Sequence, residues 1–308
     1  MKPKTLRIGT RGSLLALQQS NAVKSALEEH WPGLTVTLEI IKTTGDKITD
    51  VPLAKVGGKG LFVKEIEDAL LAGEVDLAVH SMKDVPAILP EQLEIVAIPQ
   101  REDARDVLVM HRGESLAELP GRARIGTSSL RRAAQMKLLR PDLMIENLRG
   151  NLDTRLRKVQ EGLYDAIVLA AAGLHRMGWQ HRITLYLEPE QFLPAVGQGA
   201  IGIEARRADA EVLRYLEPLH DPDTALAVTA ERSFLLELEG GCQVPIAGYA
   251  TVQGLELEFT GLVASVDGRE VFRSRARAPR SDARRLGQAI ARELLAAGAQ
   301  RILAEVYQ

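Results

Sequence analysis

The sequence predicts two α/β domains around a hinged cleft, followed by a small α+β domain with an antiparallel three-stranded sheet. Two series of alternating strand and helix patterns predict the α/β domains, because this alternation is typical of parallel sheets covered by helices. Two segments without strand or helix periodicity separate the two series and the return to the first domain. They predict a chain that crosses twice between these domains. Three consecutive strand patterns predict the last domain. The expected domains are residues 1–99 with 200–219, residues 105–193, and residues 221–308.

The first series predicts a βαβ unit followed by two further strands. Short apolar runs alternate with stretches of 3.6-residue periodicity, and Gly73 is expected to end the second helix. That helix follows a loop through Gly57, Gly58 and Gly60. Strands are expected at 6–10, 35–41, 75–80 and 93–99, and helices at 14–27 and about 61–72. The charged segment 101–106 has no apolar periodicity and is interpreted as the first crossing between the domains.

The second series repeats this rhythm and then returns to the first domain. Strands are expected at 123–127, 143–148 and 165–170, and helices at 128–139 and 151–161. The Pro- and Gly-rich segment 192–199 is interpreted as the return crossing. A strand at 200–204 and a helix near 209–219 then complete the first domain.

The last domain is expected to begin with a helix from 221 to about 239. Strands are expected at 245–252, 255–266 and 270–278. Ser281 is expected to cap a long carboxy-terminal helix.

The composition is that of an ordinary globular protein and argues against several functions. Of the 308 residues, 45% are hydrophobic and 26% are charged, and the formal net charge is −2. This charge and an aromatic content of 4% argue against nucleic-acid binding. The six histidines lack metal-ligand spacing, so no metal site is expected. Because there is no signal-like start and no apolar run of ~20 residues, we expect a cytoplasmic protein without a membrane partner.

A cluster of hydrogen-bond donors is expected where the strand 123–127 ends and the next helix begins. Thr127, Ser128 and Ser129 supply hydroxyl groups there, and Arg131 and Arg132 supply guanidinium groups. Free backbone N–H groups and the positive end of the helix dipole add to them, which favours an anion. Taken alone, the same string fits a helix that Ser128 merely caps and whose two arginines face water.

Further arginines follow other predicted strands. Arg11 follows the strand at 6–10, Arg149 follows the strand at 143–148, and Arg155 lies one turn into the next helix; Arg176 is a weaker member of the set. Ligands of open α/β sheets gather at the carboxyl ends of the strands. Because a guanidinium group can make two parallel hydrogen bonds to one carboxylate, the pattern predicts a ligand with several carboxylates.

Two acidic residues and one cysteine are candidates for chemistry. Asp84, beside Lys83 at a strand end, is either a salt-bridge partner or a group that handles protons and stabilises a cation. Asp46, in the loop 42–60, is a second acidic candidate. Cys242 is the only cysteine and lies in the loop GGCQVP at 240–245. Its thiol is either an unimportant side chain or a nucleophile that forms a stable thioether.

Six strings in order along the chain resemble the porphobilinogen deaminase family. They are KVGGKGLF at 55–62, HSMKDVP at 80–86, GTSSLRR at 126–132, LRGN at 148–151, LPAVGQG at 193–199 and EGGCQVP at 239–245. The resemblance implies three domains, of which the first two are similar to type II periplasmic binding proteins. It also implies a transferase that adds four porphobilinogen molecules, with release of ammonia, to a dipyrromethane primer on Cys242. Hydrolysis then frees hydroxymethylbilane for tetrapyrrole biosynthesis.

The resemblance also implies roles for individual residues, with Asp84 as the catalytic acid. The residues that it implies for the primer are Cys242, Ser81, Lys83, Thr127, Ser128, Ser129, Arg131, Arg132, Asp46 and Lys59. The residues that it implies for the substrate or growing chain are Arg11, Ser13, Lys55, Phe62, Arg149, Arg155, Arg176 and Gln198. Three positions depart from the family's strings: Thr44 stands where an arginine is expected, and Gly12 and Leu14 replace more typical neighbours of Ser13.

Two other functions compete with this interpretation. Two α/β lobes around a hinge are also typical of a non-catalytic solute-binding or ligand-sensing protein, which would not need Cys242. The arginines could instead bind a phosphate backbone, although the net charge argues against it. The family resemblance favours a monomer whose partner is the small molecule porphobilinogen.

Overall fold

The computed structural model describes residues 5–47, 63–238 and 244–306. The chain divides into two compact units. The first comprises Met1–Asp50, Gly58–Glu102 and Ala200–Ala225, and the second comprises Val51–Gly57, Asp103–Gly199 and Leu226–Gln308. The three-domain division, with its boundaries, stays a prediction. No helix among the described residues is long and apolar enough to cross a membrane.

The first unit contains a five-stranded sheet in the order β2-β1-β3-β10-β4. The strands are β1 (Thr5–Thr10), β2 (Thr35–Ile40), β3 (Leu77–Ser81), β4 (Leu93–Ala97) and β10 (Ile201–Arg206). Strands β1, β2 and β3 are parallel, whereas β10 is antiparallel to both β3 and β4. The carboxyl ends of the three parallel strands therefore lie at one edge of the sheet.

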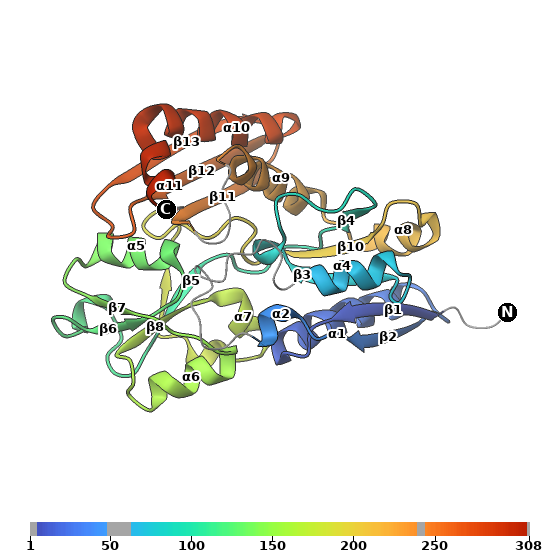
Figure 1. Ribbon diagram of the computed structural model, residues 1–308, viewed down its shortest axis with the longest axis horizontal. Coiled ribbons are helices and arrows are strands. Elements are labelled where there is room, and N and C mark those ends of the chain that lie inside the picture. The colour runs from blue at the N-terminus through green and yellow to red at the C-terminus, as the bar shows by residue number, and fades with distance from the viewer. Residues whose placement is uncertain (1–4, 48–62, 239–243, 307–308) are drawn as a thin grey trace. The chain divides into compact units, whose positions relative to one another are not determined.

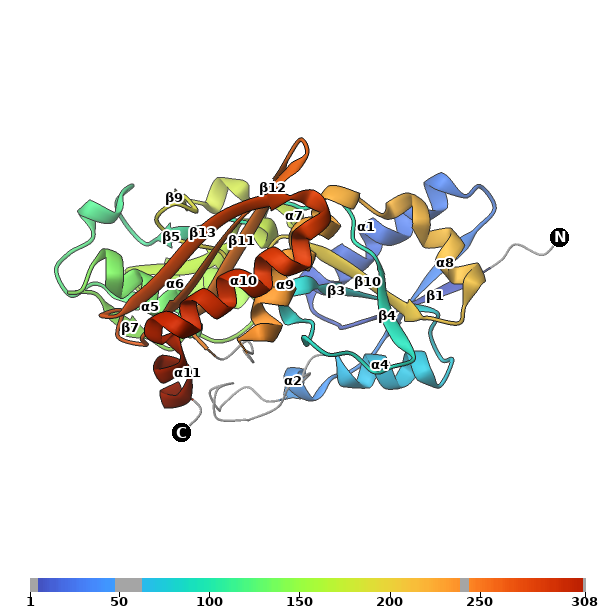
Figure 2. The same cartoon turned by 90° about the horizontal axis from the view of Figure 1, so that it is seen from above.

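Helices cover both faces of this sheet, as Figure 2 shows. The helices α1 (Leu14–His30) and α8 (Ala210–Leu216) bury Leu27 and Val212 against alternate strand residues such as Ile8 and Leu77. The helix α4 (Lys64–Leu71) buries Ile66 and Leu70 on the opposite face, together with Ala78. Because successive strand residues point to opposite faces, residues 78 and 80 of β3 face α4, while residues 77 and 79 face α1.

The second unit contains a sheet with the same pairing scheme, in the order β7-β6-β8-β5-β9. The strands are β5 (Asp106–Met110), β6 (Arg124–Gly126), β7 (Met144–Glu146), β8 (Ala166–Ala170) and β9 (Leu185–Leu187). Strands β6, β7 and β8 are parallel, and β5 is antiparallel to β8 and β9. The strands that run antiparallel to the parallel set are β10 in the first sheet and β5 in the second. Each of them directly follows a connection between the two units.

Helices cover both faces of the second sheet, as Figure 1 shows. The helix α5 (Leu130–Leu139) packs Met136 on one face. The helices α6 (Leu152–Gln160) and α7 (Ala171–Arg176) pack Leu156 and Leu174 on the other. The sequence had not predicted β5 or β9. The predicted crossing 101–106 ends where β5 begins, at Asp106.

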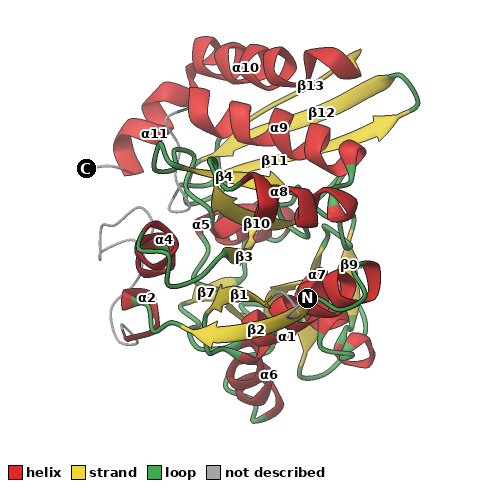
Figure 3. Cartoon of the chain, turned by 90° about the vertical axis from the view of Figure 1, so that its right-hand side faces the viewer, coloured by secondary structure: helices red, strands yellow, loops and turns green. Residues whose placement is uncertain are grey.

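The second unit also contains an antiparallel three-stranded sheet of β11 (Ile246–Gln253), β12 (Glu256–Ala264) and β13 (Val271–Pro279). Figure 3 shows α9 (Pro222–Glu237) and α10 (Ala283–Leu294) beside it. A Cβ at Gly287 of α10 would lie 2.1 Å from the carbonyl oxygen of Ala230 in α9, so only glycine allows this close approach. A π-helical turn (Leu295–Ala299) and α11 (Gln300–Val306) end the described chain.

These sheets confirm the predicted fold class, but two helices begin one or two residues later than predicted. Ser128 was expected to begin α5, but Ser129 is the N-cap residue and its Oγ accepts from Arg132 N at 3.4 Å. Ser281 was expected to cap the carboxy-terminal helix, but Asp282 occupies the N-cap position of α10. The short helix α2 (Thr44–Lys47) lies within the predicted loop. The backbone N–H of Thr44 donates to Glu65 Oε1 at 2.7 Å, so this departure from the family's strings contacts the first turn of α4.

Candidate functional site

The parallel strands of the first unit place one group of candidate residues at a single edge. Arg11 follows β1, while Lys83 and Asp84 follow β3 in a short 3-10 turn, Met82–Asp84. Met82 is 1% exposed and anchors this turn, whereas Asp84 is exposed. The edge therefore presents the carboxylate of Asp84 to solvent on a fixed backbone.

Helix α1 fixes the ends of β1 and β3 at that edge. Ser13 caps the helix, and its Oγ accepts from Ala16 N at 3.3 Å. Gln19 Nε2 donates to Ser81 Oγ at 3.1 Å, and Ser20 Oγ donates to Thr10 Oγ1 at 2.8 Å. Two neighbouring residues of one helix thus hold two different strand ends.

The second unit gathers its candidate residues at the corresponding edge. Thr127 Oγ1 accepts from Ser129 N at 3.2 Å, which closes the turn between β6 and α5. Ser128 is exposed, and Ser129 is half-buried. Two hydroxyl groups and the first N–H groups of a ten-residue helix therefore meet at the end of β6.

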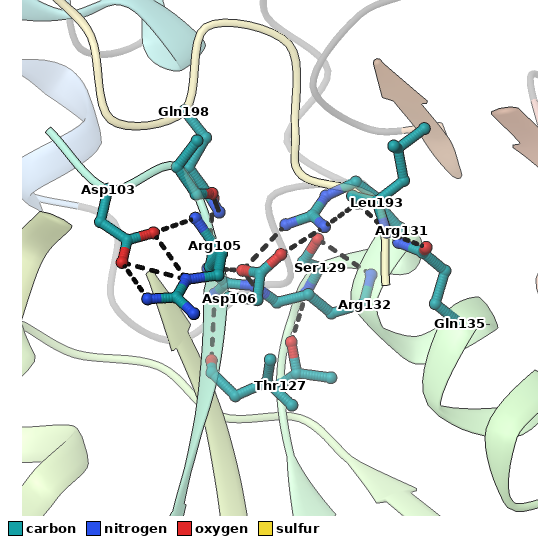
Figure 4. Close-up of polar contacts among 12 residues, drawn as sticks. Asp103, Arg105, Asp106, Thr127, Ser129, Arg131, Arg132, Gln135, Leu193 and Gln198 are labelled. Atoms are coloured by element: carbon teal, nitrogen blue, oxygen red, sulfur yellow. Dashed lines mark hydrogen bonds and ion pairs between the residues drawn. The ribbon is translucent and has the colours of Figure 1, made fainter. Parts of the chain in front are cut away.

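Arg131 and Arg132 are buried against a carboxylate that the sequence had not singled out. Arg131 Nη1 donates to Asp106 Oδ2 at 2.6 Å, and Arg132 Nε donates to Asp106 Oδ1 at 2.8 Å (Figure 4). Arg131 and Arg132 are only 5% and 7% exposed, so the alternative in which they face water is wrong. Burial raises the pKa of the Asp106 carboxyl, but the two guanidinium groups more than offset this and lower the pKa to about 2.

Three other arginines lie around the same edge, and two of them contact backbone carbonyl groups. Arg149 is half-buried just after β7. Arg155 Nε donates to Gly150 O at 2.7 Å, and Arg176 Nη2 donates to Gly199 O at 2.7 Å. Gly150 has φ +114°, a conformation that favours glycine. The turn that this conformation allows contains the carbonyl oxygen to which Arg155 donates.

Each unit therefore brings together part of the predicted set. The first unit groups Arg11, Ser13, Ser81, Lys83 and Asp84. The second unit groups Thr127, Ser128, Ser129, Arg131, Arg132, Arg149, Arg155, Arg176 and Gln198. Lys55, Lys59, Phe62 and Cys242 lie outside the described residues, as does the side chain of Asp46. The hinged cleft between the domains stays a prediction.

Gln198, a predicted substrate contact, is fully buried at 0% exposure. Its Nε2 donates to Ala104 O at 2.8 Å, and its Oε1 accepts from Arg132 Nη2 at 3.5 Å. In the described structure this amide supports Arg132.

The residues at the second edge fit an anion that carries carboxylates. They therefore fit the dipyrromethane group that the resemblance implies. Guanidinium and hydroxyl groups and a helix N-terminus are all donors that carboxylates accept from. Many of the N–H donors of Arg131 and Arg132 already bind groups of the protein, because Leu193 O and Val168 O accept from them in addition to Asp106. The hydroxyl groups and the half-buried arginines are the more accessible part of this donor set.

A separate buried cluster of titratable groups lies on the α4 face of the first sheet. His80 Nε2 is 2.8 Å from Glu204 Oε2, and both side chains are buried. Glu67 of α4 is 9% exposed, and its Oε1 has no hydrogen-bond partner among the described residues. Burial is the main cause that raises the pKa of Glu67 to about 7; the charges of Glu204 and Asp68 raise it further, although His80 opposes them.

The pKa of Glu67 predicts a loss of stability as the pH rises. The folded-state value of about 7 lies above the ordinary value of 4.5. The stabilisation from a protonated Glu67 is therefore complete below pH ~4.5 and is lost as the pH passes ~7. The unmodified protein should lose unfolding free energy between pH 5 and pH 8 as Glu67 ionises. In Glu67→Gln this loss should be smaller by on the order of 2 kcal/mol. Urea denaturation at both pH values measures the unfolding free energy of each protein.

Glu39→Gln, which changes an exposed carboxylate on β2, is the control for this experiment and should leave the loss as in the unmodified protein. An unchanged loss in Glu67→Gln would show that Glu67 is ionised in the folded protein.

Two family models match the chain. One is described as "Porphobilinogen deaminase, dipyromethane cofactor binding domain" and matches residues 6–214; the other is described as "Porphobilinogen deaminase, C-terminal domain" and matches residues 225–296.

Curated relatives match over nearly their whole length. A protein of Syntrophobacter fumaroxidans named "Porphobilinogen deaminase" is 65% identical over 309 residues, which cover 100% of both chains. A protein of Geobacter metallireducens with the same name is 55% identical, over 100% of this chain and 96% of the relative.

Solved structures of periplasmic binding proteins also resemble the chain at low identity. The aliphatic sulphonate binding protein of Escherichia coli is 15% identical and has a TM-score of 0.42, with 77% of this chain and 75% of that chain covered. A TRAP solute binding protein of Desulfovibrio salexigens is 11% identical and has a TM-score of 0.44, with 71% and 72% covered.

Proposed function

The chain belongs to the porphobilinogen deaminase family, and we propose that it condenses four porphobilinogen molecules head to tail on a dipyrromethane primer bound to Cys242. Each addition releases ammonia, and hydrolysis then frees hydroxymethylbilane and leaves the primer on the enzyme. The match of residues 6–214 to the cofactor-binding domain of the family carries this proposal. The arginines at the strand ends support it, because the primer and growing chain carry a carboxylate-rich series of acetate and propionate groups.

Most of the residues that are proposed to hold the primer lie at the second edge. When it is bound, the primer supplies the pyrrole carbon to which each new unit is joined. Ser128, Ser129 and Thr127 lie at the start of α5, where hydroxyl and N–H donors can bind a carboxylate. Arg131, Arg132 and Lys83 add positive charge. Ser81, Asp46 and Lys59 complete the proposed set, as the resemblance implies.

Asp84 is proposed to act on the reacting groups. It is exposed at a strand end and lies next to Lys83, so its carboxylate is accessible to a ligand at that edge. A carboxylate there can stabilise positive charge that develops on the substrate as ammonia leaves, and it can transfer protons to and from pyrrole nitrogen and carbon atoms.

A second set of residues is proposed to hold the substrate and the growing chain. This set is Arg11, Ser13, Lys55, Phe62, Arg149, Arg155 and Arg176, whereas the fully buried Gln198 supports Arg132 instead of contacting the substrate. Arg149 and Arg155 are the most informative members, since both are half-buried near the end of β7, where their guanidinium groups can each bind a carboxylate with two hydrogen bonds.

The experiment that tests the function combines intact-protein mass spectrometry with a count of products. We expect the purified protein to show a covalent excess that matches a dipyrromethane unit. We also expect four ammonia molecules for each hydroxymethylbilane. A protein of unmodified mass that binds porphobilinogen without releasing ammonia would contradict the proposal and would favour the solute-binding alternative.

Arg149→Leu and Arg155→Leu are expected to slow elongation. Each substitution removes a charge-assisted contact to the carboxylates of the chain, so kcat/KM for porphobilinogen should fall about 10–100-fold. Mass spectrometry after addition of limiting porphobilinogen should show covalent species with fewer added units than in the unmodified enzyme.

Arg157→Leu is the matched control, because Arg157 lies on the same helix and its side chain is 67% exposed beside Glu161. We expect it to elongate normally. Equal rates in Arg155→Leu and Arg157→Leu would show that Arg155 does not contact the chain.

We also propose that the enzyme acts as a monomer in the cytoplasm, with porphobilinogen as its small-molecule substrate and without a nucleic-acid or membrane partner. The family resemblance supports the monomer, and the near-neutral charge argues against nucleic acid. Light scattering on the purified protein tests the oligomeric state.

A further inference from the structure

Asp106 forms ion pairs with both Arg131 and Arg132 in the second unit. It is the first residue of β5, and its side chain is 0% exposed. Arg131 donates to it from Nη1 at 2.6 Å and from Nη2 at 3.2 Å. Arg132 donates from Nε at 2.8 Å, with its Nη2 at 2.7 Å from the same oxygen. One carboxylate therefore orients two guanidinium groups that lie one residue apart on α5.

The charges of this group explain why a carboxylate is needed there. Two guanidinium groups that lie close together in a buried site repel each other, and each loses the hydration that water would provide. The single negative charge of Asp106 reduces the total from two positive charges to one. Because Asp106 is fully buried, water cannot take over this role when the carboxylate is removed.

Other contacts fix the planes of the two arginines. Arg131 Nη1 donates to Leu193 O at 2.8 Å. The Gln135 side chain fixes Leu193 in turn, because its Oε1 accepts from Leu193 N at 2.7 Å and its Nε2 donates to Leu193 O at 2.9 Å. Arg132 Nη1 donates to Val168 O at 3.0 Å. Each guanidinium plane is thus held by Asp106 and by a backbone carbonyl, one in the segment after β9 and one in β8.

We propose that Asp106 is a positioning residue for the primer, which holds Arg131 and Arg132 in the orientation and at the net charge that the primer carboxylates require. This inference rests on the proposed function, because it assumes that the two arginines serve the primer. It assigns to Asp106 no contact with the primer or with the substrate.

Asp106→Asn is the variant that tests this proposal, because it removes the charge while the shape of the side chain is kept. Asp103→Asn is the matched control. Asp103 is also an aspartate that binds an arginine through both of its oxygens, since Arg105 Nε donates to its Oδ1 at 3.1 Å and Arg105 Nη2 donates to its Oδ2 at 2.7 Å. The arginine that it binds lies outside the proposed primer set.

We expect the two variants to differ in the primer that they carry. Intact mass should show the full covalent excess in the unmodified protein and in Asp103→Asn, but in fewer than about one tenth of Asp106→Asn molecules. Both variants should melt at a lower temperature than the unmodified protein. In the fraction of Asp106→Asn that carries primer, KM for porphobilinogen should stay within about twofold of the unmodified value, because the substrate-binding arginines are unchanged.

A purely structural role for Asp106 gives a different result. Full primer occupancy in Asp106→Asn, combined with a lower melting temperature like that of Asp103→Asn, would overturn the proposal. An absence of covalent excess from the unmodified protein would instead contradict the proposed function, so the two failures are distinguishable.

A milder variant covers the case in which Asp106→Asn does not fold. The Gln198 side chain hydrogen-bonds Asp106 and accepts from Arg132, so Gln198→Ala loosens the same group while its charges are kept. We expect primer-free Gln198→Ala to reload from porphobilinogen at least about threefold more slowly than primer-free unmodified protein. An equal rate of reloading would overturn the proposal.

Discussion

Cys242→Ala is expected to give a folded protein that carries no covalent excess mass and has no measurable turnover of porphobilinogen. The chain has only one thiol, so no other cysteine can form the thioether to the primer. Without that bond, nothing retains the group on which each new unit is added. The loss of turnover should therefore exceed about 10³-fold, more than the removal of a single binding contact would cause. Mass spectrometry and an assay for released ammonia measure both effects.

Cys242→Ser is the companion variant, because it keeps a small polar side chain in the loop while it replaces the nucleophile by a weaker one. We expect it to resemble Cys242→Ala. Circular dichroism should show that both variants keep the fold. Full activity in either variant, without a covalent excess, would show that the enzyme works without a thioether-bound primer.

Asp84→Asn is expected to retain the primer but to lose most of its turnover. The substitution removes a carboxylate that is proposed to stabilise positive charge and to transfer protons, and such groups contribute about 10²–10⁴-fold to rates. The loss should fall on kcat. Because Asp84 is exposed at the end of its turn, the melting temperature should change little. Single-turnover kinetics with pre-loaded enzyme separates the chemical step from binding.

Asp68→Asn is the control for this variant, since Asp68 is an exposed aspartate in the same unit, on α4. It should have the turnover of the unmodified enzyme. Normal turnover in Asp84→Asn would show that the carboxylate is not the catalytic group.

The sequence predicted the parallel strands and their helices well, and it failed where local pattern carries little information. The strands β3 and β8 are apolar runs that directly follow helical patterns, which is a strong local signal. All five residues of β5 are buried, so it has no alternation, and its first residue is an aspartate that ends a charged segment. With only three residues, β9 is too short for any periodicity.

The sequence named the candidate residues of the site but not the contacts that they make with one another. The Ser-Ser-Leu-Arg-Arg string showed that donors gather at the start of α5, because this depends on a single strand end and helix start. The pairing of both arginines with Asp106 depends instead on β5 lying antiparallel to β8, and a separation of 25 residues between Asp106 and Arg131 gives no local sign of it. An acidic residue directly before an apolar run is the one signal that could have suggested it.

The place of β10 in the first sheet has a consequence for how the protein forms during its synthesis. This strand lies between β3 and β4, yet it begins at residue 201, more than a hundred residues after β4 ends. When the first hundred residues leave the ribosome, β3 and β4 have no strand between them, and the backbone groups that each of them pairs with β10 in the folded sheet stay unpaired. The amino-terminal unit therefore cannot complete its fold until most of the chain has been translated, and its nascent sheet edges are exposed to aggregation until then.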